Sequence, residues 1–252
     1  MAPNAIDTGF TVDPESVGKN SNVINTVPQI TPGNTENYGL KIFQSSMNLL
    51  AHILIGATVG ISLLFSFRNG IPLNTTMLHI VLCVIGYQLL MSEAILSLCP
   101  YNGWSTSFRL FDKKIAHTIL QVVGSALAVA GSIIMSLSKN VNWNTLHGQF
   151  ALVAMVFTTV GLVNGLTSLY AYNLRKCLPG NLSKLTHICF GIVAFVASCI
   201  SLCYGFDKNS FKNWASPAVT YTVIGFTAAF TFIIIVNPTI TFFNKTTRIF
   251  KK

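Results

Sequence analysis

The chain has 252 residues, of which 51% are hydrophobic and only 9% are charged, and its formal net charge is +9. Soluble domains carry about 25% charged residues, so this composition excludes a water-soluble globule and indicates a membrane protein. The positive charge is no sign of nucleic-acid binding, because the basic residues lie in short loops and at the C-terminus, as membrane proteins place them, and no DNA- or RNA-binding motif accompanies them.

The first part of the chain is polar and the rest is apolar. Residues 1–40 are rich in Asn, Thr, Pro and Gly, and they contain no apolar run and no hydrophobic region of a signal peptide. This composition predicts a disordered cytosolic tail. We expect one six-span membrane domain over residues 41–243, followed by a short basic cytosolic tail over residues 244–252.

Six segments are long enough to cross the hydrocarbon core, which needs about 20 mostly apolar residues. Short connections make sequential helices antiparallel neighbours, so the sequence predicts an all-α membrane protein with spans two to five in a central four-helix bundle. Asn237-Pro238 is expected to kink or end the last helix, and we interpret Gly161-x-x-x-Gly165 as a motif for internal helix packing. The spans cover residues 44–67, 77–98, 115–137, 146–169, 186–205 and 218–236, or 218–243 if the last helix continues.

The distribution of Lys and Arg near the span ends predicts the orientation. One side of the membrane holds four of these residues and the other holds eleven, so both termini are expected in the cytosol. The smaller set is Arg68, Lys139, Lys208 and Lys212, and the larger set is Lys41, Arg109, Lys113, Lys114, Arg175, Lys176, Lys184, Lys245, Arg248, Lys251 and Lys252.

Each of the four central spans carries one histidine near its first turn: His79, His117, His147 and His187. Ionisable groups are costly inside a membrane and are usually functional there. Since consecutive spans run in opposite directions, we expect His79 and His147 at one depth near the outer face, and His117 and His187 near the cytosolic face. The separations along the chain, 147 − 79 = 68 and 187 − 117 = 70 residues, are nearly equal, as two sites of the same construction would have.

Two imidazoles on facing helices can hold a haem iron from both sides, and such a haem transfers electrons because no coordination position is open for oxygen. A tetrahedral zinc site needs four ligands together, whereas these histidines divide between two depths. A proton or metal-ion path would mix histidine with Asp or Glu, and histidines that only hydrogen-bond between helices are the remaining alternative. Sites four residues inside each face of a core about 30 Å thick would place two irons about 16–20 Å apart.

The blocks around these histidines resemble the cytochrome b561 family, and most closely its cytochrome b561 domain-containing subgroup. The resemblance covers about residues 45–240 and implies a transmembrane oxidoreductase with two haem b groups, whose axial pairs are His79 with His147 and His117 with His187. It also implies a homodimer in a vesicle membrane or the plasma membrane. The blocks are Ala51-His52, His79-Ile-Val-Leu, Leu90-Met-Ser-Glu-Ala-Ile-Leu ending at Pro100, His117-Thr-Ile-Leu-Gln, Leu146-His147-Gly148-Gln149 and Lys184-Leu185-Thr186-His187.

The resemblance further implies the substrates: an ascorbate-type donor in the cytosol, and monodehydroascorbate or a ferric chelate as the acceptor on the other side. The basic and aromatic cytosolic motif of the ascorbate-specific members is not recognisable in Ser92–Asp112, and Thr145–Gln149 replaces their lumenal Ser-Leu-His-Ser-Trp type motif. A histidine-lined metal-ion or proton transporter is the alternative function, and a membrane scaffold with incidental histidines is a third.

Five more residues near the cytosolic face are secondary candidates. His52 in span one either contacts a haem propionate or the donor, or bonds to a neighbouring helix. Glu93 either reaches the interface or a nearby Lys, or takes up a proton linked to electron transfer. Arg109, Lys113 and Lys114 precede span three and either bind propionates or an anionic donor, or only follow the positive-inside rule.

Overall fold

The structure is a computed structural model that describes residues 32–169 and 180–251. The chain divides into two compact units, Met1–Tyr38 and Gly39–Lys252, and the second contains every predicted functional residue. Most of the tail predicted to be disordered lies outside the described residues, as do the basic residues Arg175 and Lys176. α1 (Pro32–Phe67) begins before residue 41, so the first membrane helix starts inside the segment assigned to the tail.

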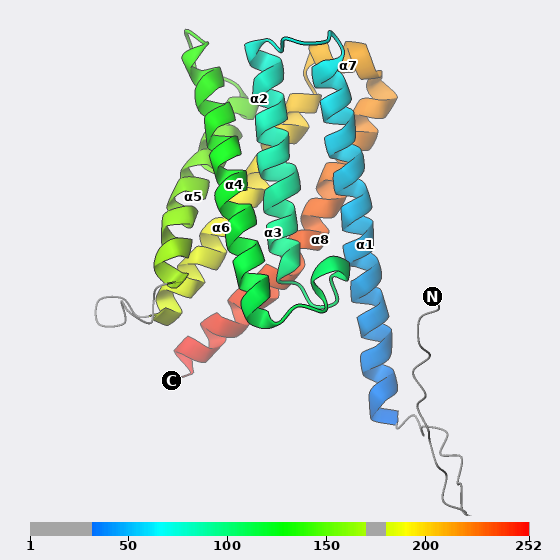
Figure 1. The fold of residues 1–252 in the computed structure, drawn as a ribbon, viewed down its shortest axis with the longest axis vertical. Coiled ribbons are helices and arrows are strands. Elements are labelled where there is room, and N and C mark those ends of the chain that lie inside the picture. The colour runs from blue at the N-terminus through cyan, green and yellow to red at the C-terminus, as the bar shows by residue number, and fades with distance from the viewer. Residues whose placement is uncertain (1–31, 170–179, 252) are drawn as a thin grey trace, which may run out of the picture. The chain divides into compact units, whose positions relative to one another are not determined.

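Every regular element among the described residues is a helix (Figure 1), and six helical segments are long and apolar enough to cross a membrane. The predicted all-α, six-span architecture is thus confirmed. The structure adds α7, a short helix between the last two spans. The segments are Tyr38–Phe67, Thr75–Ser97, Leu110–Leu137, Leu146–Thr167, Leu182–Phe206 and Pro217–Arg248. The helices after the second span are the short 3₁₀ helix η2 (Gly103–Ser105), which lies in the loop before α4, and then α4 (Leu110–Leu137), α5 (Leu146–Leu169), α6 (Gly180–Phe206), α7 (Asn209–Ala215) and α8 (Pro217–Phe250).

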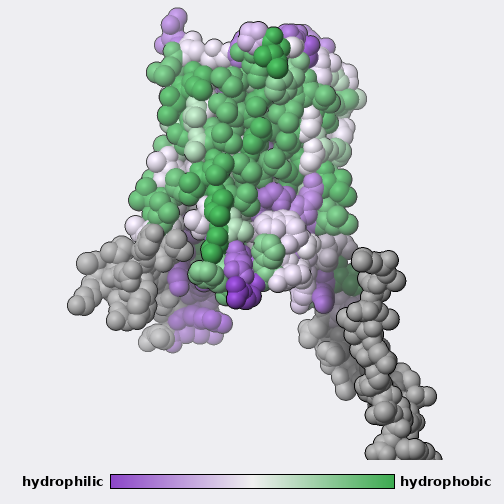
Figure 2. Space-filling model, viewed as in Figure 1, coloured by the Kyte–Doolittle hydropathy of each residue, from purple (hydrophilic) through white to green (hydrophobic). Residues whose placement is uncertain are grey.

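The surface of the second unit is apolar around the helices. Figure 2 shows hydrophobic residues over most of the face in view, with hydrophilic residues gathered toward its two ends. Large apolar side chains point outward from several helices, among them Leu64 on α1, Ile119 on α4 and Phe232 on α8, all more than half exposed. Such a surface is costly in water and matches the hydrocarbon of a bilayer. The chain is an integral, multi-pass membrane protein.

The second span has three parts: α2 (Thr75–Cys83), the π-helix η1 (Val84–Met91) and α3 (Ser92–Ser97). Asn74 begins it, because its side-chain oxygen accepts the Met77 N–H at 3.0 Å and so satisfies a backbone donor that the helix leaves free. A π-helical segment has a wider turn than an α-helix and is frequent at functional sites. Here it marks the middle of the span that carries His79.

The last helix is longer than the sequence predicts. α8 continues through Pro238 to Phe250, so the alternative in which it stops at Asn237-Pro238 is wrong. Proline removes one backbone donor from a helix, but membrane helices tolerate it, because neighbouring helices and local side chains can satisfy the freed groups. α8 therefore includes most of the segment assigned to the C-terminal tail.

Spans two to five form the core of the second unit. α4 packs along all three parts of the second span, α5 packs against α6, and further contacts of α4 with α5 and of η1 with α6 join these two hairpins. α8 lies against α6. α1 joins the bundle through a buried apolar cluster that includes Ile55, Phe195 and Phe230. The predicted central four-helix bundle is present, and α1 and α8 flank it.

Candidate functional site

Four histidines meet as two pairs inside the bundle. His79 on α2 faces His147 on α5, and His117 on α4 faces His187 on α6. The ring centres are 6.2 Å apart in both pairs, and the ring planes are nearly perpendicular, at 88° and 86°. These are the pairs expected from the antiparallel topology. We refer to the two ends of the bundle as the His79 end and the His117 end; in Figure 1 the His117 end is the lower one, where α3 ends and α4 begins.

Every one of these histidines is held by a backbone carbonyl of a neighbouring helix. Only an N–H can bond to a carbonyl oxygen, so the proton lies on Nδ1 and the Nε2 lone pair stays available. Histidines that bind metals are commonly oriented in this way by a hydrogen bond at the other nitrogen. The Nδ1 donors of His79, His117, His147 and His187 bond to the oxygens of Gly131, Ala94, Ser201 and Gly161 at 2.9, 2.8, 2.8 and 3.1 Å.

The same construction occurs in both hairpins. In the first, the histidine of span two bonds to span three and the histidine of span three bonds back to span two; the second hairpin, α5 with α6, repeats this exchange. The donor and acceptor residues are 52 and 23 positions apart in the first hairpin and 54 and 26 in the second. Each hairpin thus orients its own two histidines, and the pairs form only when the hairpins meet.

The spacing of each pair fits a single metal ion between the rings. With a metal–nitrogen bond of about 2.0 Å, and a ring nitrogen about 1.1 Å from the ring centre, two imidazoles on opposite sides of one ion have centres about 6.2 Å apart. Axial ligation of a haem iron by two histidines has this form. Within residues 32–169 and 180–251, the His, Cys, Asp and Glu side chains form no cluster of three or more.

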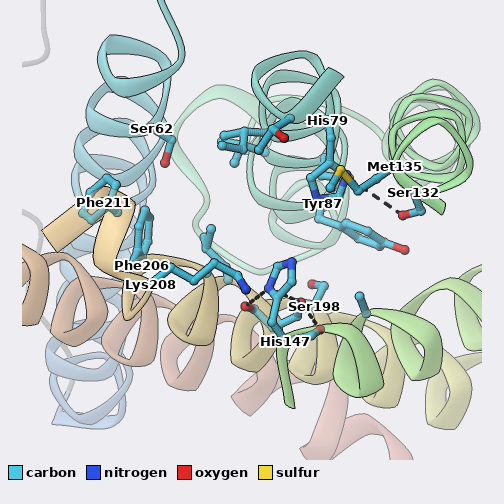
Figure 3. Close-up of a pocket in the computed structure, with 18 of the residues that line it drawn as sticks. Ser62, His79, Tyr87, Ser132, Met135, His147, Ser198, Phe206, Lys208 and Phe211 are labelled. Carbon is cyan, nitrogen blue, oxygen red and sulfur yellow. Dashed lines mark hydrogen bonds between the residues drawn. The ribbon is translucent and has the colours of Figure 1, made fainter. Parts of the chain in front are cut away.

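A cavity opens between His79 and His147, which reach into it from opposite sides (Figure 3). Small residues widen it: a Cβ added to Gly205 would already touch the His147 ring at 3.5 Å. Two cations, Lys139 and Lys208, also line the cavity. Apolar walls with a few cations suit a flat apolar group that carries carboxylates, so the residues present fit a haem at this end.

Comparison with known proteins agrees with this geometry. A sequence profile of eukaryotic cytochrome b561 matches residues 78–212, a range that runs from the second span to α7 and contains all four paired histidines. The chain belongs to the cytochrome b561 family. It is 26% identical over 191 residues to transmembrane reductase CYB561D2 of Mus musculus, which covers 74% of this chain and 82% of that protein. It is 25% identical over 195 residues to the Homo sapiens protein of the same name, with 75% and 86% covered.

Cytochrome b561 proteins are membrane-bound, bind haem b and transfer electrons across the membrane. The resemblance recognised in the sequence is confirmed. The assignment of iron to particular side chains, and the number of haems, stay predictions.

Gly165 on α5 makes room for the His187 ring, because a Cβ at this position would lie 2.8 Å from His187 Cε1. We expect Gly165→Ala to displace the ring, break its bond to the Gly161 oxygen, and lower the bound haem toward half of the parent content. The measurement is haem per chain in detergent-purified protein. Gly191→Ala is the control on α6, the helix that carries His187, since its Cβ would meet nothing within 4 Å; equal haem in both variants would contradict this role of Gly165.

The secondary candidates His52 and Glu93 contact each other. His52 Nδ1 lies 2.7 Å from Glu93 Oε1, and His52 Nε2 lies 2.7 Å from Asn102 Oδ1. A contact of His52 with a propionate or a donor stays a prediction, and it would have to compete with these two hydrogen bonds. Glu93 pairs with His52, whereas a lysine partner was one of the alternatives, and its second oxygen accepts the Trp104 Nε1–H at 2.9 Å.

The basic candidates lie just before and within the first turn of α4, at the His117 end. The Arg109 side chain is exposed and bonds to Asp112 at 2.9 Å, while Lys113 is half-buried and Lys114 is exposed. Their contact with propionates or a donor stays a prediction.

Two groups of functional residues could not be found from the sequence. The four carbonyl acceptors belong to the backbone, so no residue type marks them. Asn102 and Trp104 lie in the loop before α4 and match no motif. The one useful signal was Gly161-x-x-x-Gly165, because both glycines of this packing motif turn out to serve the His187 ring.

Proposed function

We propose that this protein carries electrons through two b-type haems, from an ascorbate-like donor in the cytosol to monodehydroascorbate or a ferric chelate on the other side of the membrane. The observation that carries this proposal is the repeated arrangement of His79 with His147 and of His117 with His187, with equal ring spacing and every Nδ1 engaged. The relatives named transmembrane reductase support this reaction class. A haem held by two histidines supplies a one-electron carrier with no open position for oxygen.

The protein's own part is to hold these carriers and to exclude water between them. The carbonyl bonds keep the four rings in place, and glycine permits close approach where a ring needs space. Between the levels of the two pairs, each of the four spans contributes buried side chains to one apolar cluster. This cluster contains Tyr87, Met91, Ala128, Ala154 and Ala197. A transporter for ions or protons would need a polar path between the two pairs. The low polarity of this cluster opposes such a path and favours electron transfer.

Cations at the two ends suit the anions of this proposal, which are ascorbate, monodehydroascorbate and the haem propionates. Lys139 and Lys208 line the cavity at the His79 end, and Lys113 and Lys114 begin α4 at the His117 end. The distribution of Lys and Arg supports the His117 end as the cytosolic one. On this orientation both termini lie in the cytosol, in a vesicle membrane or the plasma membrane, and a homodimer is part of the proposal.

The test is a visible spectrum of detergent-purified protein before and after ascorbate, and then dithionite, with haem quantified per chain. We expect two haems with a bis-imidazole spectrum, both reduced by ascorbate. Reduction by dithionite alone would overturn the proposed donor and keep the carriers. Protein without haem would overturn the proposal and favour the histidine-lined transporter.

A further inference from the structure

A polar network lies beside the His117–His187 pair and joins three segments of the chain. His52 comes from α1 and Glu93 from α3, and Asn102 and Trp104 come from the loop that leads into α4 (Figure 1). Four side-chain hydrogen bonds of 2.7–2.9 Å connect the network, and the fourth runs from Asn102 Nδ2 to Ser105 Oγ. Asn102 is fully buried, so the network is part of the protein interior and not a contact between solvated surface groups.

The two contacts of His52 match those of an imidazolium beside a carboxylate. Its Nδ1 faces a carboxylate oxygen of Glu93, and its Nε2 faces the carbonyl oxygen of Asn102, whose amide nitrogen is turned to Ser105. Neither oxygen can donate, and a neutral imidazole has only one N–H. Two such bonds therefore require both ring nitrogens to carry protons. His52 and Glu93 form an ion pair inside the membrane spans, where charged groups are usually functional.

The network reaches the paired histidines through the backbone of α3. Glu93 and Ala94 are consecutive, Ala94 is fully buried, and its carbonyl oxygen accepts the His117 Nδ1–H at 2.8 Å. The Glu93 carboxylate is held by two donors from other segments, His52 and Trp104, which fixes this turn of α3 against α1 and the loop. The acceptor at Nδ1 determines the orientation of the His117 ring and its basicity as a ligand. The contacts of Glu93, which fix the position of Ala94, therefore affect both properties of His117.

We propose that His52 and Glu93 are positioning residues for the centre formed by His117 and His187: they hold the Ala94 carbonyl against His117, and their fixed charges set the reduction potential of that centre. This inference rests on the proposed function, because it assumes a haem at this pair. Burial gives the charges their effect, since side chains only 24% and 19% exposed are screened far less than surface groups.

The test is a redox titration of purified Glu93→Gln and His52→Gln, with the two centres followed separately by their EPR signals. Removal of the carboxylate favours the reduced centre, so Glu93→Gln should raise its ratio of reduced to oxidised haem about tenfold at a fixed ambient potential, a shift of about 59 mV. His52→Gln should lower the ratio by a similar factor. The centre at His79 and His147 should stay unchanged in both variants.

Asp112→Asn is the matched control, because it removes an exposed carboxylate from the same end of the bundle. A change below about twofold is expected there, since exposed charges are screened by solvent. Asn102→Asp is the variant to use if Glu93→Gln does not fold. Aspartate keeps the shape of the side chain and places a second negative charge beside His52, at its Nε2. This variant should therefore lower the ratio of reduced to oxidised haem at the His117–His187 centre.

The opposite signs separate a charge effect from mere loosening of the structure. Shifts of the same sign in Glu93→Gln and His52→Gln, or no shift with both haems bound, would overturn the positioning proposal and leave the proposed function intact. A parent protein without haem would instead overturn the proposed function. Equal shifts at both centres would also refute the proposal, because the network contacts only the His117 side.

Discussion

Replacement of His147 by leucine is expected to leave one haem per chain in place of two. Leucine fills most of the space of the half-buried ring but offers no lone pair, so the centre proposed at the His79 end would lose one of its two proposed ligands. The other centre keeps both ligands, because each hairpin orients its histidines through its own carbonyls. The measurement is haem per chain, together with the reduction of an external ferric chelate by vesicles that contain ascorbate.

His187→Leu is the partner variant for this experiment. Both variants should bind one haem, and both should fail to pass electrons across the membrane. Only His147→Leu should keep a haem that ascorbate reduces from the cytosolic side, because its remaining centre is the one at the proposed donor end. Two haems in either variant would refute the proposed axial ligands. If ascorbate reduced the haem of His187→Leu and not that of His147→Leu, the proposed orientation would be refuted.

Gly86→Ala is expected to destabilise the whole bundle. A Cβ at this position would lie 2.6 Å from the Gly124 oxygen and 2.7 Å from the Ala128 nitrogen. Both are backbone atoms of α4, so no side chain can move aside, and η1 and α4 must separate. Overpacking of this kind costs about 1–3 kcal/mol, occasionally more, which corresponds to an apparent melting temperature lower by about 2–12 °C. Separation would also strain the bond from His79 to the Gly131 oxygen, so haem should be lost on mild heating.

Gly56→Ala on α1 is the control for this prediction, because a Cβ there would meet nothing within 4 Å. Alanine has the higher helix propensity, by about 1 kcal/mol, so this variant should melt at or slightly above the parent temperature. A Gly86→Ala protein as stable as Gly56→Ala would show that the helices can separate without cost.

Much of the fold and of the candidate site could be read from the sequence. The six spans followed from apolar length, and antiparallel order followed from short connections, so the depth of each histidine followed from its place in its span. Depth alone therefore predicts the pairs His79 with His147 and His117 with His187, which the structure contains. Of the alternatives at Pro238, only the stop is wrong, because the rule that proline ends a helix is weaker for a helix that other membrane helices support.

By itself, the sequence determined that the chain spans a membrane six times, and that four of the spans bring their histidines together in two layers. Length, hydropathy and direction are local properties, and they suffice for this. Only the tertiary structure decided which carbonyls hold the rings, that Gly86 and Gly124 bring two backbones into contact, and that His52 bonds to Glu93 and Asn102. These contacts join residues 23–54 positions apart, and several involve backbone atoms that every residue type possesses. No pattern in the chain marks them, because they exist only once the hairpins have packed.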